Sequence, residues 1–95
     1  MERLEIKSRV DTKLDEWKRT LDIMRAKVDA SEDDATAKYQ EQVVALEKQH
    51  HELKAKAADV WDSAEDKWDA AAQDVERALD EWEQRAASAR DSLLK

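Results

Sequence analysis

One apolar stripe runs along almost the whole 95-residue sequence and limits what the chain can fold into. Between Val10 and Leu93, 24 mostly apolar positions recur every three or four residues. Their average spacing is about 3.6 residues, which is one turn of an α-helix. A stripe of that period stays on one face of a helix, and such a face is buried against a neighbouring helix. The stripe therefore predicts an all-α protein.

The residue types that are missing argue against the other fold classes. The chain has no Gly, Pro or Asn, on which tight turns between strands depend. It has no Cys, so disulfides and thiolate metal sites are impossible. Ala, Glu, Lys, Leu and Arg make up more than half of the chain, a composition typical of coiled coils and long helices.

The helical architecture has two alternatives within a single unit spanning residues 1–95. One is an uninterrupted amphipathic helix, since the stripe crosses every candidate break in phase. The other is a helical hairpin that turns near residues 29–36, where Ser31 can cap a helix with an acidic first turn. A second candidate break lies near residues 57–59. In either case we expect assembly into a coiled coil or helical bundle.

The stripe is expected to need partner helices from other copies of the chain. Leu, Ile and Val together supply only 16 residues, a low aliphatic content for a chain that builds its own core. We therefore predict a homo-oligomer. Its predicted interface consists of Leu14, Trp17, Leu21, Met24, Val28, Tyr39, Val43, Leu46, His50, Leu53, Val60, Trp68, Val75, Leu79 and Trp82.

His50 is a polar residue on the stripe and the main candidate for chemistry. Glu47 and His50 form a Glu-x-x-His pair, the spacing used in di-iron helical bundles. Such a site needs further inward carboxylates, and the stripe offers none near this pair. A polar residue that sets helix register is therefore the favoured interpretation, with Glu47 and His50 as weak metal candidates. No cofactor is predicted.

Charge narrows the range of partners. The formal net charge is −7, of which residues 61–95 carry −5, so nucleic acid and anionic membranes are disfavoured. Three of the four Trp residues lie on the stripe, which favours core packing over a membrane interface; Trp61 lies one residue off it. The N-terminus lacks the apolar region of a signal peptide, and no apolar run has membrane-spanning length. The expected location is the cytoplasm.

The sequence resembles a family of small bacterial coiled-coil proteins of uncharacterised function. The resemblance rests on Lys13-Leu14-Asp15-Glu16-Trp17 at the start, on the Ala26-Lys27-Val28-Asp29 segment, and on a Trp-rich acidic tail that ends in Leu79-Asp80-Glu81-Trp82. It covers most of residues 10–90. It implies a helical, self-associating protein and no catalytic residues.

The resulting hypothesis is a non-enzymatic structural or scaffolding protein that self-associates through its stripe. The expected partner is the chain itself or another helical protein. One alternative is an amphipathic protein whose stripe binds lipid surfaces, as apolipoproteins do. The other is a metal-binding or cation-binding helical bundle that uses His50 and acidic residues.

Overall fold

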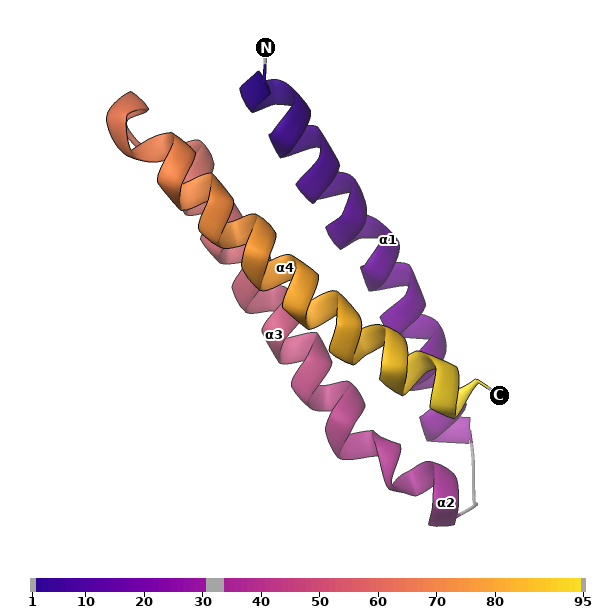
Figure 1. The fold of residues 1–95 in the computed structure, drawn as a ribbon. Coiled ribbons are helices and arrows are strands. Elements are labelled where there is room, and N and C mark those ends of the chain that lie inside the picture. Colours follow the sequence, from indigo (N-terminus) through magenta and orange to yellow (C-terminus); the bar gives the residue numbers. More distant parts are fainter. Residues whose placement is uncertain (1, 31–33, 95) are drawn as a thin grey trace.

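The structure is a computed structural model that describes residues 2–30 and 34–94 (Figure 1). Helix α1 spans Glu2–Ala30, α2 spans Asp34–Ala37, α3 spans Tyr39–Trp61 and α4 spans Glu65–Leu93. Between α2 and α3, Lys38 keeps right-handed helical dihedrals, and its N–H donates to the Asp34 carbonyl at 3.3 Å. The one-turn helix α2 therefore leads almost directly into α3. The prediction of an all-α fold is confirmed.

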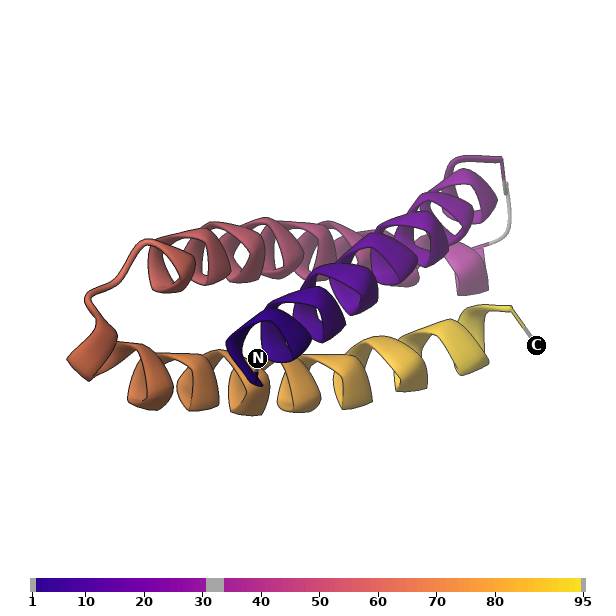
Figure 2. The same ribbon diagram turned by 90° about the horizontal axis from the view of Figure 1, so that it is seen from above.

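The three long helices form an up-down-up bundle (Figure 1). Helices α1 and α4 run in the same direction, and α3 runs against both. Helix α1 crosses the α3–α4 pair obliquely (Figure 2), and each long helix contacts the other two. The described residues form a rod of 51 × 18 × 16 Å. The helices that cover the stripe in this structure thus come from the same chain, and the expected homo-oligomer stays a prediction.

The stripe forms the interior of this bundle. Among the described residues, nineteen apolar residues and His50 are buried, and they come from all three long helices. Large and small side chains alternate in this core: Trp82 is 1% exposed, and Ala86, one turn further along α4, is fully buried. Such alternation lets facing helices interdigitate without voids. The low aliphatic content is offset by three buried Trp residues, each with a large apolar area.

The chain reverses direction at two places. Helix α1 ends at Ala30 and α2 begins at Asp34, inside the segment 29–36 considered as a break; the proposed cap Ser31 lies outside the described residues. The second break was placed wrongly near residues 57–59, which lie inside α3. The chain turns instead at residues 62–64, because Ala57 and Ala58 are strong helix formers whereas Asp62 and Ser63 favour turns.

The turn at residues 62–64 also changes which Ala residues face the core. Ala64 belongs to the stripe in the sequence, yet it is exposed at the start of α4. Ala72 is 1% exposed, while its neighbour Ala71, the stripe position, is only half-buried. Ala72 lies about one turn from both Trp68 and Val75 on the buried face of α4, and Ala71 lies at the edge of that face. Helix α4 then orients itself by its bulky residues Trp68, Val75 and Trp82.

Candidate functional site

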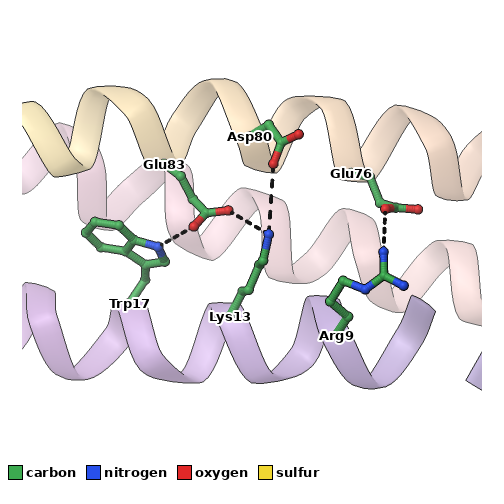
Figure 3. Close-up of polar contacts among 6 residues, drawn as sticks. All are labelled: Arg9, Lys13, Trp17, Glu76, Asp80 and Glu83. Carbon is green, nitrogen blue, oxygen red and sulfur yellow. Dashed lines mark hydrogen bonds and ion pairs between the residues drawn. The ribbon is translucent and has the colours of Figure 1, made fainter. Parts of the chain in front are cut away.

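A row of polar contacts joins α1 to α4 along one side of the bundle (Figure 3). The Arg9 guanidinium lies 3.5 Å from the Glu76 carboxylate. The Lys13 ammonium lies 3.4 Å from Glu83 and 4.0 Å from Asp80. Glu83 also accepts a hydrogen bond of 2.9 Å from the indole N–H of Trp17. We call Arg9, Lys13, Glu76, Asp80 and Glu83 the α1–α4 ladder.

The ladder offsets an unfavourable arrangement of helix dipoles. Parallel neighbours such as α1 and α4 place like ends of their macrodipoles side by side. The sequence places opposite net charges on them: α1 carries eight basic and seven acidic residues, and α4 carries four basic and nine acidic. Basic side chains of α1 therefore face acidic side chains of α4. This pairing favours the parallel neighbour over other arrangements of the same three helices.

A buried cluster of Trp17, His50 and Trp82 joins all three long helices at mid-length. The Trp17 and Trp82 rings meet edge to face, with 5.3 Å between centroids. The His50 ring lies 5.6 Å from that of Trp82. Edge-to-face aromatic pairs contribute about 0.5–1.5 kcal/mol beyond their area burial. We call this the central cluster.

Both polar groups at the centre of the cluster donate to backbone carbonyls of neighbouring helices. His50 Nε2 lies 2.6 Å from the Leu14 carbonyl of α1, and since a carbonyl only accepts, Nε2 carries the proton. Trp82 Nε1 donates to the Leu46 carbonyl of α3 at 3.2 Å. A helical carbonyl has a second lone pair for such a bond. Because both bonds have specific partners, they fix the axial register of all three helices.

Two cation–π contacts between described residues also join α1 to α4. The Arg90 guanidinium lies 5.3 Å from the Trp17 ring, and that of Arg3 lies 5.2 Å from the Trp68 ring. Trp68 also contacts the half-buried Trp61, with 5.5 Å between ring centroids. Trp61, the one Trp off the stripe, therefore packs against the core at the turn end of the bundle.

A short ion pair joins α1 to α3. Arg25 Nη1 lies 2.6 Å from the Glu47 carboxylate. This hydrogen bond and the charge of Glu47 raise the pKa of the Arg25 guanidinium above its ordinary value, and Asp29, 3.4 Å away, raises it further. A raised pKa of a base favours folding below the pKa, and that contribution is lost only above it. Arg25 therefore stays charged at every pH at which the bundle is expected to fold.

The structure places the predicted interface residues inside one chain. Fourteen of the fifteen are buried, and Tyr39 is half-buried at the edge of the core. The predicted set is thus brought together around the central cluster rather than left on a surface. Association through these residues, whether with a second copy or with lipid, requires the bundle to open or to share helices.

The two weak metal candidates are engaged in different contacts. His50 donates to the Leu14 carbonyl inside the core, and Glu47 pairs with Arg25 nearer the surface. Nowhere in residues 2–30 and 34–94 do three His, Asp or Glu side chains converge as a metal site would require. The contacts of His50 instead match the register-setting role.

The described residues form open grooves on the outer surface of the bundle. Two adjoining hollows of about 590 and 350 Å³ lie between α3 and α4, on charged and amide side chains such as Gln42, Gln49, Glu81 and Arg85. Small-molecule sites are commonly enclosed and mostly apolar. None of the described helices has a stretch long and apolar enough to cross a bilayer.

The fold and its contacts define the class of this protein as an antiparallel three-helix bundle. Buried hydrogen bonds from His50 and Trp82 to backbone carbonyls of neighbouring helices set the axial register of the bundle. Comparison with protein-family models, curated proteins and solved structures finds no match. The contacts of the chain itself therefore carry the functional argument.

We expect a charge reversal on the ladder to destabilise the bundle. Lys13→Glu places a third acidic group beside Asp80 and Glu83, and we expect it to lower the free energy of unfolding by about 1 kcal/mol, the scale of partly exposed ion pairs. Lys18→Glu makes the same change in net charge at an exposed position of α1 outside the ladder. Urea denaturation of both variants in low salt measures the difference; equal stabilities would contradict a structural role for the ladder.

Proposed function

We propose that this chain is a non-enzymatic structural protein that self-associates as a small helical scaffold in the cytoplasm. One observation carries the proposal. The apolar stripe extends through all three long helices, and His50, its buried polar residue among those that the structure describes, is bound to the backbone of a neighbouring helix. The contacts of the interior therefore hold the helices in register, as expected of a structural protein.

Self-association is supported by the nature of the stripe. It is the main apolar face among the described residues, and the large apolar side chains that these residues leave exposed are far apart in the sequence: Leu4, Ile23, Val44 and Leu94. Helices of another copy carry the same stripe and can make the same hydrogen bonds from His50 and Trp82. They can therefore replace helices of the first copy without any new chemistry.

Sedimentation equilibrium with far-ultraviolet circular dichroism on the same samples tests the proposal. We expect a helical species whose average mass rises from 11.0 kDa toward a defined multiple between 10 µM and 1 mM protein. A helical species that stays at 11.0 kDa over this whole range would contradict self-association. Loss of helix on dilution would instead indicate that the chain folds only when it associates.

A further inference from the structure

The turn between α3 and α4 is made of residues that also suit a helix. Asp62 keeps right-handed helical dihedrals, at φ −92° and ψ −2°. Ala64 has a helical φ of −62°, but its ψ of 149° is extended. None of the described residues has a positive φ, so the turn depends on no glycine-like conformation. A change in ψ at Ala64 is therefore one step between this turn and a helical path.

The stripe keeps its phase across the turn. Val60, Ala64 and Trp68 follow at intervals of four residues, so they lie on one face when the helix is continuous. In the bundle Val60 and Trp68 are buried, at 4% and 5% exposure, while Ala64 between them is exposed. A continuous helix returns Ala64 to the apolar face. The sequence thus fits a closed turn and a straight helix equally well.

Straightening at Ala64 separates α4 from the α1–α3 pair of its own chain. Residues 39–93 then form one helix of about 80 Å at about 1.5 Å per residue. The surface left behind carries Trp17, His50 and Lys13, whose partners Trp82 and Glu83 lie on α4. A second copy in the same conformation supplies an identical α4. The acidic ladder residues of that helix can pair with the basic ladder residues on α1 of the first copy. The exchange is reciprocal, as a twofold dimer requires.

We propose that the chain dimerises by exchanging α4 through straightening at residues 62–64, so that each α1–α3 pair binds the α4 of a second copy. This inference rests on the proposed self-association and gives it a mechanism. The central cluster and the ladder re-form between chains with the same atoms. The dimer therefore gains one helical turn in place of each loop and loses no core contact.

Ala64→Pro separates the two conformations. Proline fixes φ near the −62° already present, and the Ala64 N–H donates none of the hydrogen bonds described for the turn. In a continuous helix the same proline removes a backbone bond and clashes with the preceding turn. We expect Ala64→Pro to keep the helical bundle and to weaken dimerisation at least about 100-fold. The reverse variant, Asp62→Ala with Ser63→Ala, is expected to strengthen dimerisation because Ala favours helix.

Crosslinking reports directly on the exchange. The chain has no Cys, so Lys13→Cys with Glu83→Cys introduces its only two thiols, one on α1 and one on α4, at a contact of the ladder. A short bis-maleimide joins them within one chain in the closed bundle and between chains in the exchanged dimer. We expect covalent dimers at protein concentrations where sedimentation detects dimers. Ala64→Pro in this background is expected to give only monomers crosslinked within the chain.

The outcomes distinguish this inference from the proposed function. Dimers that persist in Ala64→Pro and crosslink only within chains would overturn the exchange and leave self-association standing, through outer faces. A wild-type chain that stays at 11.0 kDa up to 1 mM would overturn both. If Ala64→Pro loses its helical circular dichroism, the crosslinking pattern of the chain with wild-type Ala64 decides alone.

Discussion

Replacing Trp82 with Ala is expected to lower the free energy of unfolding by about 3–5 kcal/mol, the usual cost of truncating a fully buried aromatic side chain. Trp82 is 1% exposed and contacts Trp17, His50 and the Leu46 carbonyl, so its removal opens a cavity where all three helices meet. Domains of this size have total stabilities of about 5–15 kcal/mol. Urea denaturation followed by circular dichroism at 222 nm measures the loss.

Trp61→Ala is the matched control for this prediction. It removes the same side chain from a half-buried position that packs against the core and contacts Trp68. We expect a loss of about 1–2 kcal/mol, since partly exposed aromatic contacts contribute less. If both variants lose the same stability, the central cluster does not hold the three helices together, and the described packing at mid-length is wrong.

The core of the bundle could be predicted from the sequence because burial follows the helical period. Leu14, Trp17, Val43 and Leu79 lie on the stripe and are all buried. Periodicity reports which face of a helix is buried, but not which helix covers it. The same stripe is buried equally in a long coiled coil between chains and in a bundle within one chain. The stripe therefore predicts which residues are buried and leaves open whether their partner helices belong to the same chain or to another copy.

The turn at residues 62–64 was missed because its residues carry no strong stop signal. Ala64 is a good helix former, yet it has an extended ψ at the start of the helix that buries Trp68 in the core. Tertiary packing here outweighs local propensity. The same weakness of local preference makes the straight conformation accessible, so the failed prediction and the proposed exchange of α4 have one physical cause.

The residues of the α1–α4 ladder form a pattern in the sequence, but the pattern can be recognised only once the order and direction of the helices are known. Arg9 and Lys13 are one turn apart on one flank of the stripe, and so are Glu76 and Asp80. Such pairs recur elsewhere in a chain in which 43% of residues are charged, and most of them face solvent. Two chain reversals are needed before these four residues meet. The hydrogen bonds of His50 and Trp82 are hidden for the same reason, since their acceptors are backbone carbonyls.

The sharpest test of the buried stripe compares two aspartates placed two residues apart on α3. Leu46 is 5% exposed and faces the core, whereas Val44 is 46% exposed and faces away from it. Leu46→Asp removes a large apolar side chain and places a carboxylate in the core without a partner, which we expect to cost about 4 kcal/mol or more. The bundle should then be largely unfolded at 37 °C, as measured by circular dichroism. Val44→Asp should change stability by less than about 0.5 kcal/mol.

The two aspartate variants also test self-association, because the same residues form the core of one chain and of an exchanged dimer. Leu46→Asp should therefore remove the helical monomer and the dimer together, and raising the protein concentration should not restore either. A Leu46→Asp chain that is unfolded when dilute but folds into dimers when concentrated would place Leu46 outside the shared core. Since Leu46 also provides the carbonyl that accepts from Trp82, that result would contradict the axial register on which the arrangement of α3 and α4 depends.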